Sequence, residues 1–152
     1  MNFRMRTSLQ MFKKDGNKMR AKLINNIKLV KNFKDSEKFI DSEFDYTNET
    51  DEMILDSVKG TNIFVIYNND IVCGVIDYKI RTKDIIINWI YIGYKFRGFS
   101  ISKQVFNFLK TKYQLPIILH PFTNDAEEAF IKQGFVIDPE YDHNDPNTLV
   151  LY

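Results

Sequence analysis

The sequence predicts a single α+β domain in which strands form one mixed sheet and helices flank it. Apolar residues alternate at strand spacing in some segments of the 152-residue chain and recur at helical spacing in others. These segments follow one another in the order β-α-α-β-β-β-α-β-α-β-β. A chain of this length can bury one core and is too short for two comfortable domains. We therefore expect one domain over residues 23–152, preceded by a basic N-terminal extension over residues 1–22.

The first three elements are short periodic runs bounded by capping residues. Alternation over Ile27–Lys31 predicts a strand. Asp35-Ser36 can cap a helix that continues to about Phe44. A second helix is expected over Asp51–Val58, and Gly60 would end it.

Three strands are expected at the centre of the chain. Ile63–Tyr67 and Ile71–Ile80 are rich in β-branched and aromatic residues, and Asn68-Asn69-Asp70 between them is typical of a hairpin. A second turn over Arg81–Asp84 leads into a strand over Ile85–Ile92. The chain therefore reverses direction twice in this stretch.

The C-terminal part alternates helices with short strands. Apolar spacing predicts a helix over Ile101–Lys112, and the strand after it ends at His120. A further helix over Asp125–Gln133 would be closed by Gly134. The final strands are expected at Phe135–Ile137 and Thr148–Tyr152, and the apolar stripe of the first helix should comprise Ile101, Val105, Phe108 and Leu109.

Composition excludes several kinds of protein. No apolar run approaches the roughly 20 residues that a membrane-spanning helix needs. Cys73 is the only cysteine, so no intrachain disulfide and no cysteine-based metal site are expected, and two histidines are too few for a zinc finger. We expect no metal and no membrane partner, and a reducing, cytoplasmic setting fits best.

Charge is unevenly distributed although the net charge is only +1. Residues 1–34 carry ten Lys or Arg against one acid, and residues 35–56 carry nine Asp or Glu against Lys38 alone. A third acidic patch comprises Asp138, Glu140, Asp142 and Asp145. Such asymmetry can mark nucleic-acid or cationic-ligand surfaces, but solvated helix faces explain it more simply. Nucleic-acid binding by residues 1–22 is disfavoured because they lack spaced aromatic residues for base stacking.

Residues 90–103 combine a strand end, a turn and the start of a helix. Apolar residues up to Ile92 run into Phe96-Arg97-Gly98, and an amphipathic helix opens at Ile101. This layout directs free backbone N–H groups and the positive end of a helix dipole at one place. It predicts an anion site, and a diphosphate suits it.

The same stretch resembles the acetyl-CoA loop of the GNAT superfamily of N-acetyltransferases, whose usual pattern is apolar-x-Pro-x-Tyr-Arg-Gly-x-Gly-x-Gly. Ile92 takes the apolar position, Tyr94 stands where Pro is usual, and Phe96-Arg97-Gly98 match the aromatic-Arg-Gly. Ser100 and Ser102 replace the last two glycines. The predicted element order also agrees with the GNAT fold, a mixed sheet splayed after its fourth strand, over about residues 24–152.

The resemblance implies acetyl-CoA as the cosubstrate. The strand-end backbone of Ile90, Tyr91 and Ile92 would bind the acetyl carbonyl and the pantetheine, with the Ile92 N–H as the oxyanion donor. A bulge there would part this strand from the next. Serine would fit at position 100 if the residue has helical φ. The loop residues implied to bind the cofactor are Arg97, Gly98, Phe99, Ser100, Ile101, Ser102 and Lys103.

A second match lies in residues 126–135, which resemble the family's Ala-x-x-x-Tyr-x-x-x-Gly-Phe helix. Ala126, Gly134 and Phe135 are in register, and this helix, preceded by Asn124, would flank CoA. Phe130 occupies the position where many members place a Tyr that protonates the leaving thiolate. Phenylalanine has no proton to give, so the resemblance implies a proton from solvent.

The general base is less clear. The family often has a carboxylate on the fourth strand, but before Tyr91 residues 86–92 offer only Asn88 and Trp89 as polar-capable positions. His120, at the end of the fifth strand, is the best titratable candidate. A lone histidine is more often structural than catalytic, so both roles stay open.

These features together predict an N-acetyltransferase that transfers acetyl from acetyl-CoA to an amine by direct attack. The acidic region Asp35–Asp56 lies where the family builds its acceptor side, which favours a cationic acceptor such as a polyamine, a Lys side chain or a protein N-terminus. The alternative is a CoA-binding protein with weak or no activity that acts as a regulatory partner, because of Phe130 and the two serines. A homodimer also stays open.

Overall fold

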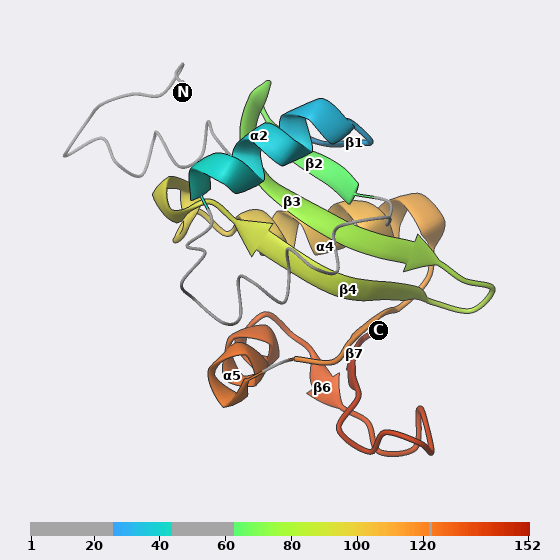
Figure 1. Cartoon of the computed structure of the whole chain (residues 1–152). Coiled ribbons are helices and arrows are strands. Elements are labelled where there is room, and N and C mark those ends of the chain that lie inside the picture. Colours follow the sequence, from blue (N-terminus) through green and yellow to red (C-terminus); the bar gives the residue numbers. More distant parts are fainter. Residues whose placement is uncertain (1–25, 44–62, 122) are drawn as a thin grey trace. The chain divides into compact units, whose positions relative to one another are not determined.

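The structure, a computed structural model, describes residues 26–43, 63–121 and 123–152. Hydrogen bonding joins seven strands into one mixed sheet in the order β1-β2-β3-β4-β5-β7-β6, and the described segments also contain helices α2, α4 and α5 (Figure 1). The predicted α+β class is confirmed. The extension expected over residues 1–22 and the helix expected over Asp51–Val58 lie outside the described residues.

The chain divides into two compact units. The first holds the described residues up to Asp77 together with Ile90–Val105, and the second holds Tyr78–Trp89 and Phe106–Tyr152. In the segments that the structure describes, no helix is long and apolar enough to cross a membrane.

The first unit contains β1 (Ile27–Val30), β2 (Ile63–Asn68) and β3 (Ile71–Ile80) as far as Asp77, and these strands pair antiparallel. The turn between β2 and β3 has Asn69 at φ 54° and Asp70 at φ 68°. Two consecutive residues at positive φ are typical of the type I′ turn, whose twist matches that of the strands, and Asn and Asp tolerate this conformation. The predicted hairpin is therefore confirmed.

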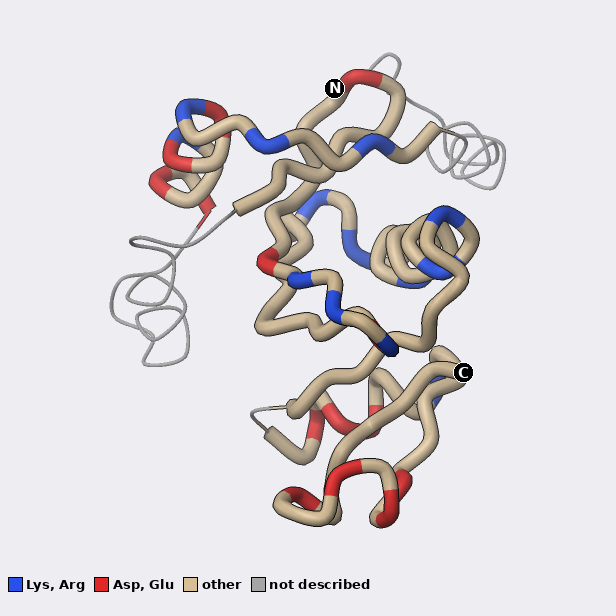
Figure 2. The backbone as a smooth tube through the Cα atoms, turned by 90° about the vertical axis from the view of Figure 1, so that its right-hand side faces the viewer, with Lys and Arg blue, Asp and Glu red and all other residues tan. Residues whose placement is uncertain are grey.

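Helix α2 (Phe33–Glu43) begins earlier than predicted because Asn32 caps it. The Oδ1 of Asn32 accepts the Asp35 N–H at 3.1 Å, so the prediction that Asp35-Ser36 forms the cap is wrong. Asp35 accepts a hydrogen bond from the Tyr67 hydroxyl at 2.7 Å instead, which ties α2 to β2. Phe39 and Ile40 are buried, and α2 and the first turn of α4 lie on opposite faces of the strands (Figures 1 and 2).

Helix α4 (Ile101–Tyr113) and strand β4 (Ile85–Ile92) run through both units. The predicted apolar stripe of α4 needs one correction, because Phe106 is buried whereas Phe108 is half-exposed. The Lys112 ammonium lies 5.8 Å from the centre of the Phe108 ring, as expected for a cation over an aromatic face near the surface.

In the second unit, β4 pairs parallel with β5 (Ile117–Leu119), and β5 pairs antiparallel with β7 (Leu149–Leu151). The short strand β6 (Val136–Ile137) forms the edge. Helix α5 (Asn124–Lys132) lies between β5 and β6 in sequence. The core of this unit is apolar, and its fully buried side chains include Phe106, Leu109, Ile85, Ile117, Phe135 and Leu149.

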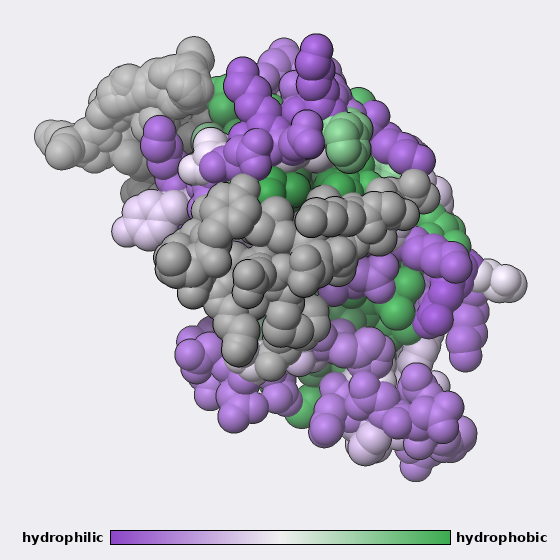
Figure 3. Space-filling model, in the orientation of Figure 1, coloured by the Kyte–Doolittle hydropathy of each residue, from purple (hydrophilic) through white to green (hydrophobic). Residues whose placement is uncertain are grey.

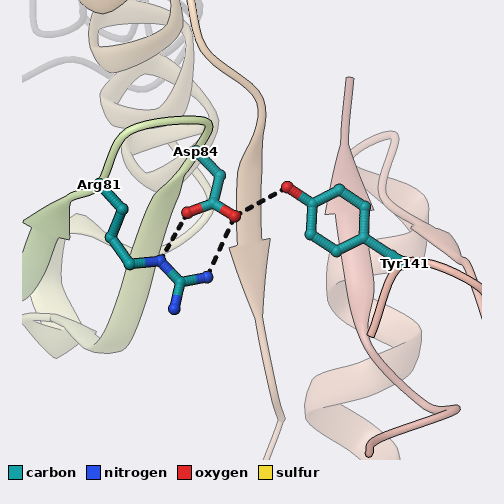
Figure 4. A network of polar contacts seen from close by, with 3 residues as sticks. All are labelled: Arg81, Asp84 and Tyr141. Atoms are coloured by element: carbon teal, nitrogen blue, oxygen red, sulfur yellow. Dashed lines mark hydrogen bonds and ion pairs between the residues drawn. The ribbon is translucent and has the colours of Figure 1, made fainter. Parts of the chain in front are cut away.

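An ion pair between the exposed Arg81 and the buried Asp84 lies at the turn between β3 and β4 (Figure 4). The carboxylate of Asp84 accepts hydrogen bonds from the Nε and Nη2 of Arg81 at 2.6 and 3.0 Å, and a third from the Tyr141 hydroxyl at 2.7 Å. Burial by itself raises the pKa of Asp84, but the hydrogen bonds from Arg81 and Tyr141 outweigh it and leave the pKa lowered. Within the second unit, this network fastens the C-terminal loop to the turn between β3 and β4.

Candidate functional site

The end of β4 turns one backbone N–H away from β3. The Gly93 N–H donates to the Cys73 carbonyl on β3 at 2.8 Å, and the Tyr91 carbonyl oxygen lies 2.5 Å from where a Cβ on Gly74 would stand. In a trans peptide, each N–H points opposite to the preceding carbonyl. Because the Tyr91 carbonyl points toward β3, the Ile92 N–H points away from it.

Strand β4 also extends further than β5, its neighbour on the other side. Pairing with β5 extends from Ile85–Ile117 to Ile87–Leu119, and β5 ends there while β4 continues to Ile92. The splay predicted after the fourth strand is confirmed.

The regular alternation in which the backbone N–H groups of β4 point to one side and then the other is not kept up to Gly93. The Ile85 N–H donates to the Pro116 carbonyl, on the β5 side. Strict alternation would turn the Gly93 N–H toward the same side, yet it bonds to β3. The alternation is therefore interrupted between these two positions, and the bulge that the resemblance implied stays a prediction.

Arg97 folds back onto the strand end. Its Nε donates to the Ile92 carbonyl at 2.9 Å, and its guanidinium lies 5.2 and 5.9 Å from the ring centres of Tyr91 and Tyr94. The loop is also tied to α2, since the Tyr94 N–H donates to the Glu43 carboxylate at 3.1 Å and the Tyr91 hydroxyl donates to the Glu43 carbonyl at 3.3 Å. The motif in the sequence did not reveal these contacts.

Two residues of this loop have left-handed backbone conformations. Gly98 has φ +85° and Ser100 has φ +61°. The condition under which serine would fit easily at position 100, a helical φ, is therefore not met, and the usual glycine there has a conformational reason. Helix α4 begins directly afterwards, with the Gln104 N–H bonded to the Ser100 carbonyl at 3.1 Å.

The start of α4 is suited to an anion. Ile101, Ser102 and Lys103 form its first turn, whose N–H groups have no acceptor within the helix itself. The helix dipole adds partial positive charge at this end, and Lys103 in the first turn adds a full charge. Phe99, half-buried, precedes the turn.

Helix α5 carries the second set of predicted residues. Thr123 caps it by accepting the Ala126 N–H at 3.1 Å, Asn124 is its first residue, and Gly134 follows it at φ +108°. The Phe130 ring packs against Phe106 and Phe135, with ring centres 6.1 and 5.7 Å apart. Phe130 is thus half-buried in an aromatic cluster.

His120 does not stand alone, because its Nδ1 lies 2.9 Å from the Oδ2 of Asp145. Both side chains are 39% exposed. They face a pocket of about 660 Å³ at the end of β5. We call it the β5 pocket, and it is lined by His120, Pro121, Thr123, Asn124, Glu127, Asp145 and Asn147.

Two other residues of the strands are informative. Trp89, the only tryptophan of the chain, is 5% exposed, and its Nε1 has no hydrogen-bond partner among the described residues. It lies two residues beyond the last β4–β5 pair, where the strands part. Cys73 is fully buried, and burial raises the pKa of its thiol, so it is the small buried apolar residue that we expected.

No family model and no curated protein sequence matches the chain. Solved structures do match. One is the N-acetyltransferase YlbP of Bacillus subtilis, solved in complex with coenzyme A, which is similar over 82% of this chain and 94% of that one, with a TM-score of 0.52 and 14% identity.

Two further structures give the same result. An acetyltransferase from Thermus thermophilus matches 84% of this chain and 95% of its own, with a TM-score of 0.52 and 14% identity. A putative GNAT-family acetyltransferase from Bacteroides thetaiotaomicron matches over 82% and 84%, with a TM-score of 0.51 and 15% identity. Similarity at such identities is a similarity of fold. The splayed sheet, the loop after β4 and these neighbours together establish that the chain has the fold of the GNAT N-acetyltransferases.

Proposed function

We propose that this chain is an N-acetyltransferase that moves the acetyl group of acetyl-CoA to an amine. The observation that carries the proposal is the orientation of the Ile92 N–H, which points away from β3 on a strand that continues beyond β5. A backbone donor held in place before the reaction is what an oxyanion needs, because it costs no reorganisation when charge develops.

The loop after β4 would hold the diphosphate of the cofactor. Its N–H groups and the start of α4 supply the donors, and Gly98 keeps the backbone open to close approach. Arg97 would keep the strand end and the loop in register through its bond to Ile92. Cofactor-binding roles are proposed for Ile90, Tyr91, Ile92, Arg97, Gly98, Phe99, Ser100, Ile101, Ser102, Lys103, Asn124 and Phe130.

The reaction would be direct acyl transfer. The lone pair of a neutral amine attacks the thioester carbonyl carbon, and the carbonyl oxygen becomes an oxyanion that accepts the Ile92 N–H. As the C–N bond forms and the C–S bond breaks, CoA leaves as a thiolate. Phe130 has no proton to donate, so solvent or the amine nitrogen protonates the thiolate. His120 is the proposed base that takes a proton from the ammonium form of the acceptor and so frees the lone pair of the amine.

Trp89 provides a direct test of cofactor binding, since its fluorescence is the only tryptophan signal of the chain. Addition of acetyl-CoA should change that fluorescence saturably, and calorimetry should give the same dissociation constant. Gly98→Val should weaken binding at least about tenfold, because a β-branched residue is strongly disfavoured at φ +85° and obstructs the loop. No binding at millimolar acetyl-CoA would refute the proposal.

A second function is favoured by one observation, the packing of Phe130 into an aromatic cluster. With no hydroxyl at this position, the chain could bind CoA and act as a regulatory partner with little turnover. Assay of a panel of amines beside the binding measurement separates the two functions. For an enzyme, Phe130→Tyr should keep the fold and give equal or modestly higher turnover. CoA binding without turnover of any amine, in both forms, would favour the partner.

A further inference from the structure

The last residue of α2 contacts the end of β4 on both sides of Ile92. The carbonyl of Glu43 accepts the Tyr91 hydroxyl at 3.3 Å, and its Oε1 accepts the Tyr94 N–H at 3.1 Å. The Phe39 ring, one turn earlier in α2, packs edge-on against the Tyr91 ring, with 6.5 Å between the ring centres. All of these residues belong to the first unit. One turn of α2 therefore holds the two residues that flank this stretch of the backbone.

Glu43 also serves as the cap of a short 3₁₀ turn, η1 (Tyr94–Phe96). The residue before this turn is Gly93, which has no side chain to accept the first N–H of the turn. A side-chain oxygen that accepts such an N–H stabilises the start of a helical turn. Glu43 supplies that oxygen from another element, 51 positions earlier in the sequence.

The two peptide groups that follow the Ile92 N–H in the chain are both fixed. The first joins Ile92 to Gly93, whose N–H bonds to β3 at 2.8 Å. The second joins Gly93 to Tyr94, and Glu43 holds it through the Tyr94 N–H. Because each peptide group is planar, rotation of the Ile92 N–H against these groups is limited to the bonds at the Ile92 Cα. Tyr91, on the other side, is held by Glu43 as well.

Gly93 leaves room for this approach of α2. Its φ is −57°, a value that other residues adopt readily, so its own conformation does not require glycine. A Cβ added there would lie 3.0 Å from the Cζ of Phe39 and 3.1 Å from the Oε1 of Glu43. The outer face of α2, seen in Figure 3, is mostly hydrophilic, as expected for a helix that packs through its other face.

We propose that Glu43 is a positioning residue for the proposed acetyl transfer, because its contacts with Tyr91 and Tyr94 fix the direction of the Ile92 N–H. This inference rests on the proposed function, in which that N–H donates to the acetyl carbonyl. A donor that is oriented before the reaction costs no reorganisation when the oxyanion forms. Glu43 acts through the backbone and is assigned no contact with the acetyl group.

Amide hydrogen exchange tests the contact in the protein without cofactor. Glu43→Ala removes the acceptor, so exchange of the Tyr94 N–H should become about tenfold faster, the effect of losing one hydrogen bond. Glu43→Gln keeps a side-chain oxygen and should stay close to the parent. Tyr67→Phe is the matched control, since it removes the bond to Asp35 that ties the other end of α2, and it should leave the Tyr94 N–H unchanged. Equal exchange in the parent and in Glu43→Ala would overturn the proposal.

Gly93→Ala tests the same contact from the side of the strand. Its Cβ would push against Phe39 and Glu43, so exchange of the Tyr94 N–H should become faster here too. Combined with Glu43→Ala, it should add little, because the bond to Tyr94 is already lost. Fully additive effects would contradict a shared contact.

Acetyl-CoA then tests the positioning role. In ¹⁵N spectra, saturating acetyl-CoA should move the Ile92 N–H signal in the parent and in Tyr67→Phe, and it should move that signal much less in Glu43→Ala. The dissociation constant of acetyl-CoA should change less than about threefold, because the oriented donor matters most in the transition state. For any amine that is turned over, kcat should fall about ten- to a hundredfold in Glu43→Ala. A fall of the same size in Tyr67→Phe would mean that Glu43 is merely structural.

Failure of this inference and failure of the proposed function are distinguishable. If Trp89 fluorescence shows no acetyl-CoA binding to the parent, acetyl transfer itself is refuted and the positioning role falls with it. If acetyl-CoA binds and moves the Ile92 signal equally in the parent and in Glu43→Ala, the proposed function stands and Glu43 is not a positioning residue.

Discussion

The hydroxyl of Tyr141 donates a hydrogen bond to the Oδ2 of Asp84 at 2.7 Å, although 57 positions separate the two residues in the sequence. Asp84 is fully buried, and an unpaired carboxylate there would be costly. Arg81 supplies the countercharge from the same turn, and Tyr141 supplies the third hydrogen bond from the C-terminal loop (Figure 4). The loop that carries Asp145 is thereby attached to the turn that begins β4.

Tyr141→Phe should lower the free energy of unfolding by about 1–2 kcal/mol, because Asp84 loses a donor that nothing replaces in the buried site. Urea unfolding followed by circular dichroism measures the change. Tyr152→Phe is the matched control, since the Tyr152 hydroxyl donates to Asp138 at the surface and its loss should cost less. Equal losses in the two variants would show that burial of Asp84 adds nothing to this bond.

The same network predicts how stability depends on pH. The folded-state pKa of Asp84 lies below its usual 3.8, so its contribution is present above about pH 4 and is lost as the pH falls through the lowered value. Burial, with the bond to Asp84, raises the pKa of Tyr141 to about 12, so its contribution is present below about pH 10 and is lost as the pH rises toward 12. Urea unfolding at a series of pH values should show both declines.

Tyr141→Phe should reduce the alkaline decline without abolishing it. The pKa values of Tyr67 and Tyr78 are also raised to about 12, mainly by burial, and these residues stay in the variant. An alkaline slope that is identical in the variant and the parent would contradict the assignment of part of it to Tyr141.

Local chemistry explains which elements the sequence could predict. The β2–β3 hairpin follows from Asn69 and Asp70, whose tolerance of positive φ is a property of the residues themselves. The start of α2 was missed because Asn32 and Asp35 are both good capping residues, and the choice depends on Tyr67 of another strand holding Asp35. Tertiary contacts of this kind leave no spacing in the sequence.

In the candidate site, too, the sequence predicts some groupings of residues and not others. The loop after β4 is contiguous, so the order of residue types from Ile92 to Lys103 was enough to predict an anion site there. The pair of His120 and Asp145 joins the end of β5 to the turn before β7, and no sequence interval links them. Only the acidic patch that contains Asp145 gave a signal, and a solvated surface explained that signal as well.

Gly74→Ala should destabilise the protein by about 1–3 kcal/mol, because its Cβ would stand 2.5 Å from the backbone oxygen of Tyr91 and β4 must shift. The shift would displace the Ile92 N–H, so acetyl-CoA turnover should fall as well. Gly98→Ala separates steric from conformational effects. Nothing lies within 4 Å of a Cβ added to Gly98. This substitution should therefore lower the free energy of unfolding by only about 1 kcal/mol, the cost of a Cβ at φ +85°. A larger loss for Gly98→Ala than for Gly74→Ala would contradict the close approach.

Ser100→Gly should stabilise the protein by about 0.5–1 kcal/mol, since glycine adopts φ +61° without the penalty of a Cβ. It also restores the usual residue of the acetyl-CoA loop, so affinity for acetyl-CoA should be equal or tighter. Ser100→Ala keeps the Cβ and should leave stability close to that of the parent. Thermal unfolding and the Trp89 titration give the two readouts. A loss of stability in Ser100→Gly would show that the serine side chain makes a contact that offsets the strain.

A protein that starts at Leu23 should stay folded and keep its affinity for acetyl-CoA within a few-fold. The first described contact of the domain is at Asn26, whose carbonyl accepts the Asn69 N–H at 3.1 Å, and β1 begins at Ile27. Residues 1–22 are basic, weakly periodic and interrupted by Gly16, so they can bury little apolar surface alone. Their apolar residues, among them Phe3, Leu9 and Phe12, could still pack on the domain or on a second copy. Insolubility of the shortened protein, or a tenfold loss of acetyl-CoA binding (about 1.4 kcal/mol), would assign residues 1–22 to the core or to a dimer interface.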